Sequence, residues 1–238
     1  MGKLASVLCA AFVLTGLSAA WAQEGSSSVS GTIKLDGAAK RKKLNSQLDS
    51  DKYCGPQRNE QDVLSEDVIT GANNELANVF VWVKKGIKGT FKAPDTKVEI
   101  DQNKCIYHPH IITVMVGQVF VIKNSDDTMH NIHGLGKLNG EFNEGQGQKG
   151  MTSEKKFSVQ EIGIKIKCDV HPWMGAWMHV VGHPFFDVSK ADGTYKIDKL
   201  PAGTYEIEFW HEKFGKETKS VTVDGKAGVT EDFTFKAK

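Results

Sequence analysis

A strand that ends in a cysteine and leads directly into a short loop constrains this chain more than any other feature. In residues 161–167, isoleucines alternate with glycine or lysine, the period-2 pattern of a half-buried strand. Cys168 continues the buried parity, so its sulfur should point inward at the strand end. Pro172 lacks an N–H and disfavours helix in the residue before it, which favours a change from strand to loop. Residues 178–182 predict a return strand.

The loop carries one thiol, one imidazole and one thioether at a fixed spacing. Cys168, His171 and Met174 stand at positions i, i+3 and i+6, and an upstream His-x-x-His pair supplies a second imidazole. Two His and one Cys form the trigonal plane of a blue-copper site, with Met as a weak axial ligand. The residue types and their order therefore predict one type 1 copper ion.

Zinc is the alternative metal. It could use Cys168, His171, His130 and His133, but structural zinc sites are commonly richer in Cys and have paired ligand spacings on both sides. Zinc would also leave Met174 unused. Copper is the better match to the set.

These residues resemble the copper-binding motifs of the cupredoxins. The matching segments are His130-Asn-Ile-His133 and Cys168-x-x-His171-Pro-Trp-Met174, and the short spacing from His to Met is most similar to the amicyanins. The resemblance covers about residues 96–184 and implies a Greek-key sandwich over residues 91–186. The copper ligands that it implies are His130, Cys168, His171 and Met174.

The same resemblance implies roles for residues around the ligands. Asn131 should join the two ligand segments by hydrogen bonds. Independently of the resemblance, Trp173 and Trp177 flank the loop, and we expect them to cover the core end of the sandwich, to form an apolar docking face around His171 for a partner protein, or to do both. The chain departs from the family at Trp177, where small residues are common, and at Ile164, where an aromatic residue is usual. Neither of these is a ligand.

A second resemblance concerns the two ends of the chain. The segment Asp192-Gly-Thr-Tyr-x-Ile-x-x-Leu-Pro-Ala-Gly-Thr-Tyr205 is similar to the second half of carboxypeptidase regulatory-like (transthyretin-like) β-sandwiches. Residues 31–33 and 76–83 match the first half. Because residues 187–238 alone give a meagre core, we expect an all-β chain in which the copper sandwich (91–186) is inserted into this sandwich (24–90 plus 187–238). The alternative is that the two sandwiches are packed beside each other.

The N-terminus indicates the compartment. Residues 1–22 contain Lys3, an apolar run and Ala20-Trp21-Ala22, which predicts a secretory signal peptide cleaved after Ala22 and not a membrane span. Cleavage would remove one lysine and no acid from 30 basic and 29 acidic residues, which leaves a net charge of zero. The mature chain thus lacks the surplus of basic residues that would indicate a nucleic-acid or anionic-lipid partner. We expect a periplasmic or secreted protein.

The four cysteines can then be assigned. Cys9 leaves with the signal peptide and Cys168 is a ligand. Cys54 and Cys105 remain, and in an oxidising compartment they should form a disulfide. The alternative is two unrelated buried thiols.

The function follows from the site and not from the fold. We expect a copper protein that carries single electrons between redox protein partners and is not an enzyme, because no catalytic copper motif of the His-Cys-His type surrounds Cys168. The alternative is a copper-binding or delivery protein, for which His108, His110, Met129, Met151 and Met178 would be suited. Whether His108 and His110 form a second metal site is left open by the sequence.

Overall fold

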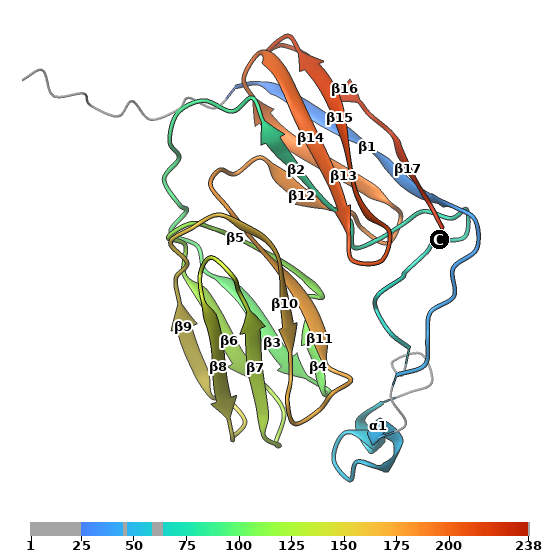
Figure 1. The fold of residues 1–238 in the computed structure, drawn as a ribbon, viewed down its shortest axis with the longest axis vertical. Helices are drawn as coiled ribbons and strands as arrows, with labels where there is room; N and C mark the ends of the chain where they lie inside the picture. The colour runs from blue at the N-terminus through green and yellow to red at the C-terminus, as the bar shows by residue number, and fades with distance from the viewer. Residues whose placement is uncertain (1–24, 45–46, 59–63, 238) are drawn as a thin grey trace, which may run out of the picture.

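The protein is all-β. A computed structural model describes residues 25–44, 47–58 and 64–237, so the predicted signal peptide lies outside the described residues. Apart from one helical turn, α1 (Gln47–Ser50), and one 3-10 turn, η1 (Gly55–Gln57), the regular elements are strands in two sandwiches (Figure 1). This confirms the expected fold class. Within the described residues, no helix is long and apolar enough to cross a membrane.

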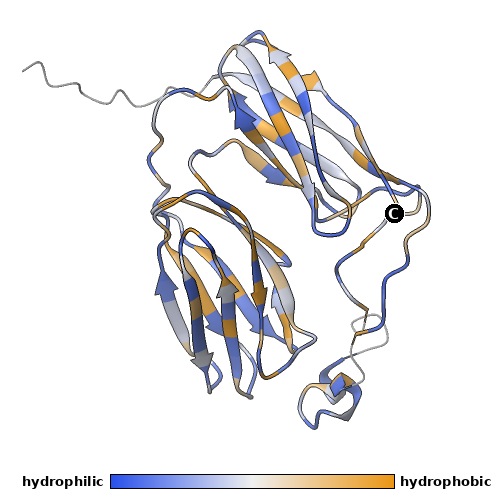
Figure 2. Cartoon of the chain, in the orientation of Figure 1, coloured by the Kyte–Doolittle hydropathy of each residue, from blue (hydrophilic) through white to orange (hydrophobic). Residues whose placement is uncertain are grey.

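The central sandwich contains the predicted metal loop. Its five-stranded sheet has the order β5-β11-β10-β7-β8, and its four-stranded sheet has the order β4-β3-β6-β9. Apolar and polar residues alternate along the strands (Figure 2), so each sheet turns one apolar face toward the other. The strands are β3 Val98–Asn103, β4 Ile106–His108, β5 Ile111–Met115, β6 Phe120–Asn124, β7 His130–Leu135, β8 Glu141–Gln146, β9 Thr152–Lys155, β10 Glu161–Lys167 and β11 Gly175–Val181.

A bulge in β10 changes the predicted side-chain pattern. Its register with β11 shifts between Ile162 and Ile164, and Gly163 between them has a φ of +80°. A positive φ favours glycine, and the extra residue reverses the side-chain parity. Ile164 therefore belongs to the central core with Ile166 and Cys168, whereas Ile162 packs in the seam between the two sandwiches. The expectation that all three isoleucines share one face is wrong for Ile162.

The outer sandwich joins strands from both ends of the chain. Its sheets have the orders β12-β2-β14-β15 and β13-β1-β16, with β17 also paired to β1. In the first sheet Val81 faces Phe209, and in the second Val29 faces Ile197. The strands are β1 Ser27–Asp36, β2 Phe80–Lys85, β12 Phe186–Val188, β13 Thr194–Leu200, β14 Gly203–His211, β15 Gly215–Val223, β16 Val229–Thr230 and β17 Phe233–Lys236.

These pairings support the nested organisation, which we infer from them. Strands β1 and β2 precede the central sandwich in sequence, yet they pair with strands that follow it. The chain passes from β2 into the central sandwich and returns from it to the outer sandwich through β12. These two strands are antiparallel neighbours, with Phe186 opposite Trp82. Insertions are tolerated where the ends of a host loop already lie together. The family assignment of the outer sandwich stays a prediction.

An aromatic seam holds the two sandwiches against each other. Phe80 and Trp82 of β2 are buried against Ile111 and Met115 of β5 and against Val181 of β11. The ring of Phe80 also stacks on His179 of β11, with the ring centroids 4.0 Å apart. The seam therefore covers β5, β11 and the start of β10 on one side of the five-stranded sheet, and Figure 1 shows the loop after β10 at the other end of the central sandwich from β2.

The predicted disulfide is confirmed. Cys54 and Cys105 are bonded at 2.03 Å, while Cys168 is free and buried. The bond ties the segment between β1 and β2, which includes α1 and η1, to the hairpin turn between β3 and β4. Leu48 of α1 is buried in the central core as a result.

Candidate metal centre

The loop after β10 folds back on itself. The Cys168 amide donates to the Met174 carbonyl at 3.3 Å, and the Met174 amide donates to the His171 carbonyl at 2.9 Å. The His171 amide lies 3.3 Å from the Cys168 sulfur and donates to it. These bonds bring the side chains of Cys168 and His171 to one end of the sandwich.

His130, the first residue of β7, completes a cluster with this loop. Its Nδ1 lies 2.8 Å from the Nδ1 of His171, which in turn lies 4.0 Å from the sulfur of Cys168. The ligand atoms of the three residues all lie within 4.8 Å of one another. His130 is 0% exposed, Cys168 2% and His171 5%. Three borderline and soft donors thus converge in a site from which water is largely excluded.

Met174 stays a predicted axial ligand. It is 1% exposed and belongs to the same apolar cluster as Cys168. It ends the same loop, as the spacing predicts.

The electrostatics of the cluster favour a thiolate. Burial alone would raise the pKa of Cys168, but hydrogen bonds with His130 and His171 and with backbone amides outweigh it and lower the pKa to about 5. A thiolate is the form of cysteine that binds metals. One thiolate and two imidazoles are a donor set that fits copper, and His133 does not join it.

Asn131 connects the segment of His130 to the segment of Cys168 by hydrogen bonds. Its Oδ1 accepts the Asp169 amide at 2.8 Å, and its Nδ2 donates to the Asp169 carboxylate at 3.1 Å. The same Oδ1 lies 3.2 Å from the sulfur of Cys168, which donates to it while protonated. Residues next to His130 and next to Cys168 are thus held together directly.

His133 occupies a polar network beside the cluster. Its Nδ1 lies 2.8 Å from the Asp169 carboxylate and its Nε2 lies 2.5 Å from Glu141. The hydrogen bond with Glu141, followed by that with Asp169, raises the pKa of His133. His133 therefore braces the outside of the loop.

Two carboxylates that the sequence analysis did not identify lie at the outer edges of the histidines. The Asp126 carboxylate is 2.9 Å from His130 Nε2, and the Asp51 carboxylate is 3.8 Å from His171 Nε2. Burial raises the pKa of Asp126, but hydrogen bonds from His130 and from the amides of Cys105 and Lys104 hold it below its ordinary value. Asp126 is therefore ionised.

The predicted docking face needs a correction. Trp173 lies beside His171, with ring centroids 5.0 Å apart, and its indole donates to the Cys105 carbonyl at 3.1 Å. Trp177 instead packs against Trp210 of the outer sandwich, and its indole donates to Glu212 at 2.9 Å. The side chain of Trp177 packs in the seam between the sandwiches, so the two tryptophans do not form one face around His171.

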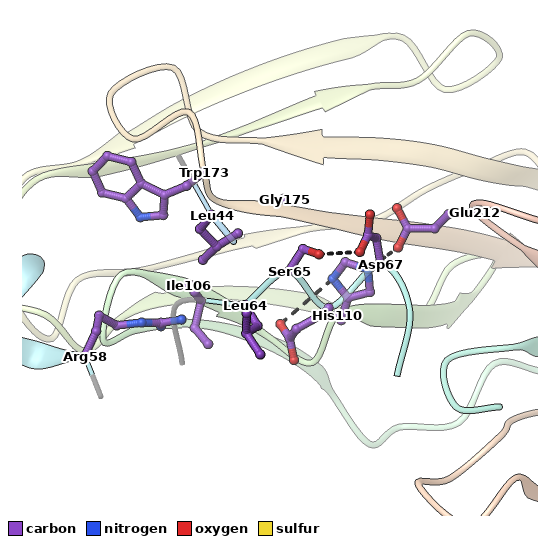
Figure 3. A pocket seen from close by; sticks show the side chains of 11 residues that line it. Leu44, Arg58, Leu64, Ser65, Asp67, Ile106, His110, Trp173, Gly175 and Glu212 are labelled. Carbon is purple, nitrogen blue, oxygen red and sulfur yellow. Dashed lines mark hydrogen bonds and ion pairs between the residues drawn. The ribbon is translucent and has the colours of Figure 1, made fainter. Parts of the chain in front are cut away.

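His108 and His110 have different surroundings. His108 is exposed, whereas His110 lines a cavity of about 160 Å³ that lies between the central sandwich and the segment joining β1 to β2, with Glu212 of the outer sandwich at its edge (Figure 3). His110 Nε2 is paired with Glu212, and its Nδ1 is 4.0 Å from Glu66. Neither histidine belongs to a metal-capable group found among the described residues. His110 thus serves as a polar link between the sandwiches.

Comparisons with known proteins give a partial likeness. No protein-family model and no curated protein matches the chain. Among solved structures, a mutant of amicyanin in its Cu(I) form is 20% identical, covering 42% of this chain and 97% of that chain, with a TM-score of 0.32. The copper-containing nitrite reductase from Thermus scotoductus SA-01 is 18% identical over 42% of this chain and 25% of that chain, with a TM-score of 0.33. A purple cupredoxin from Nitrosopumilus maritimus is 23% identical over 36% of this chain and 99% of that chain, with a TM-score of 0.30. At these TM-scores the likeness carries no argument about function, which depends on the site.

Proposed function

We propose that this chain is a periplasmic or secreted type 1 copper protein that carries single electrons between redox protein partners. The observation that supports this most is the convergence of the His130 and His171 Nδ1 atoms and the Cys168 sulfur in one buried cluster. Copper bound there would supply a one-electron redox couple, and Met174 would be its weak fourth ligand.

The protein's own contribution is to hold the ligand side chains in position and to exclude water from them. Hydrogen bonds within the loop and through Asn131 hold the Cys168 and His171 side chains before any metal arrives. A site that does not rearrange between oxidation states has a low barrier to electron transfer. This rigidity suits an electron carrier.

Burial favours a carrier over a delivery protein. A receiving protein must present its own ligands to the metal, yet the three clustered ligands are at most 5% exposed. Met178, which would suit delivery, is fully buried in the core, and His110 is paired with Glu212. The remaining metal-capable groups of the described residues include Cys54 or Cys105, whose sulfurs are in the disulfide.

The test is an optical spectrum of the copper-loaded protein. It should be intensely coloured, bleach with a mild reductant and recover on reoxidation. Cys168→Ser should abolish the colour without unfolding the chain, because the two sandwich cores do not depend on the metal. His171→Ala should also abolish the colour, whereas the matched control His108→Ala, at an exposed histidine, should keep it. A colourless, redox-silent copper protein would remove the proposal.

The proposed compartment has its own test. After expression of the full chain in a bacterium, the mature protein recovered from the periplasm should begin at Gln23. A protein that keeps residues 1–22 in the cytoplasm would contradict it.

A further inference from the structure

The two histidines of the cluster are arranged alike. Each turns its Nδ1 toward the other ligands and its Nε2 toward a carboxylate. His130 Nε2 lies 2.9 Å from Asp126 Oδ2, and His171 Nε2 lies 3.8 Å from Asp51 Oδ2. The carboxylates come from separate segments, Asp126 from the turn before β7 and Asp51 from the turn after α1.

Both carboxylates are fixed by backbone amides of the disulfide segments. Asp126 accepts from the amides of Lys104 and Cys105, each at 2.7 Å. Asp51 accepts from the amides of Tyr53 and Cys54, at 2.9 Å and 2.7 Å. Each half of the Cys54–Cys105 disulfide therefore donates its own N–H to one of the two carboxylates. A single covalent bond links the segments that hold both.

We propose that Asp126 and Asp51 are positioning residues for the two imidazole ligands, and that the Cys54–Cys105 disulfide holds this pair of carboxylates in place. The electrochemical part of this proposal rests on the proposed copper function. An ionised carboxylate can only accept a hydrogen bond, so a bond from His130 to Asp126 requires the hydrogen on Nε2. That tautomer leaves the Nδ1 lone pair free to face the metal.

The two carboxylates should differ in strength. The Asp126 side chain is 5% exposed and within hydrogen-bond distance, whereas the Asp51 side chain is 29% exposed and farther from its histidine. Solvent screens the charge of the more exposed group more strongly. A negative charge near the metal favours Cu(II) over Cu(I), so removing Asp126 should favour Cu(I) more than removing Asp51 does.

The first experiment is a redox titration of the copper-loaded protein, followed by its visible absorption. Asp126→Asn should raise the Cu(I)/Cu(II) ratio at a fixed ambient potential about tenfold, an upward shift of the reduction potential of about 59 mV for a one-electron couple. Asp51→Asn should shift the ratio in the same direction by less. If Asp126→Asn does not fold, Asp51→Asn still tests the direction, because its amide oxygen can keep both backbone hydrogen bonds.

Each variant has a matched control. Asp127→Asn removes the same charge one residue farther along, from an exposed side chain. Asp49→Asn removes a charge from α1 that is paired with Lys43, with a side chain 52% exposed. Both controls should leave the ratio close to that of the unchanged protein. Shifts in Asp126→Asn and Asp51→Asn no larger than in these controls would overturn the proposal.

The second experiment needs no copper. In the metal-free protein at about pH 8, the imidazole ¹⁵N chemical shifts should show that the Nε2 atom of His130 carries a hydrogen, whether or not Nδ1 carries one as well. Hydrogen on Nδ1 alone would overturn the role of Asp126, even if the protein is coloured. If the copper-loaded protein is colourless, the proposed function fails, whereas Nε2 protonation would still support the positioning role.

Discussion

Replacing His179 with phenylalanine should make the protein less sensitive to mild acid. His179 is fully buried in β11, stacked on Phe80 and edge-on to Trp210 at a ring-centroid distance of 4.7 Å. Its Nδ1 accepts the Gly163 amide at 3.2 Å, while its Nε2 has no hydrogen-bond partner among the described residues. Burial lowers its pKa from 6.5 to about 3, because a charged imidazole would be desolvated.

The direction in which His179 changes the stability with pH follows from the order of its folded and unfolded pKa values. The folded-state pKa lies below the unfolded value of 6.5, so the unfolded chain takes up the proton first as the pH falls. His179 therefore lowers the stability of the native protein as pH drops below 6.5, by about 1.4 kcal/mol per pH unit. Between pH 6.5 and pH 5 the loss amounts to about 2 kcal/mol.

Phenylalanine keeps the ring in the seam but cannot titrate. At pH 7 the His179→Phe variant should be less stable by about 1–3 kcal/mol, because the Gly163 amide loses its acceptor. By pH 5 this difference should shrink by about 2 kcal/mol. Urea unfolding followed by tryptophan fluorescence at several pH values measures this difference in unfolding free energy. Phe186→Leu, a seam substitution without a titrating group, should shift stability equally at every pH. A constant gap between native protein and His179→Phe from pH 7 to pH 5 would refute the reasoning.

The other predictions concern the axial ligand, the disulfide and the bulge. Met174→Leu should keep copper bound and raise the reduction potential, because losing a weak donor favours Cu(I); an unchanged potential would show that Met174 is not axial. The Cys54→Ser/Cys105→Ser double variant should lose about 4 kcal/mol of unfolding free energy in urea, because the bond closes a long loop, and a negligible loss would contradict this. Gly163→Ala should cost roughly 1–2 kcal/mol, because its φ is positive, and a variant as stable as the native protein would argue against the bulge.

The prediction of the centre of the candidate site rests on local patterns in the sequence. The spacing of Cys168, His171 and Met174 places them in one loop, and the side-chain parity of β10 points Cys168 inward. Both are short-range properties, which a few neighbouring residues determine. The disulfide could also be predicted, because only two cysteines remained for an oxidising compartment.

Features that depend on distant contacts could not be predicted in this way. Asp126 stands in a turn that looks solvent-exposed in sequence, and nothing local indicates that it reaches His130. Trp177 lies four residues from Trp173, but β11 carries it to Trp210 of another sheet. A bulge at Gly163 moved Ile162 to the seam, and alternation alone does not reveal an extra residue in a strand.

The pairing of both chain ends has a consequence for the order of folding. Trp82 donates to Glu208 at 3.1 Å across a sequence separation of 126 residues, so β2 has no partner from β14 until most of the chain has been synthesised. Contacts between residues so far apart in sequence carry a high entropic cost of loop closure and form late. Neighbouring strands within the central sandwich are nearer to each other in sequence. Strands β3 to β11 of the central sandwich therefore all precede β14 in the chain, and this sandwich can close without waiting for β14 to pair with β2. We expect the central sandwich to fold first and so to bring β2 and β14 of the outer sandwich together.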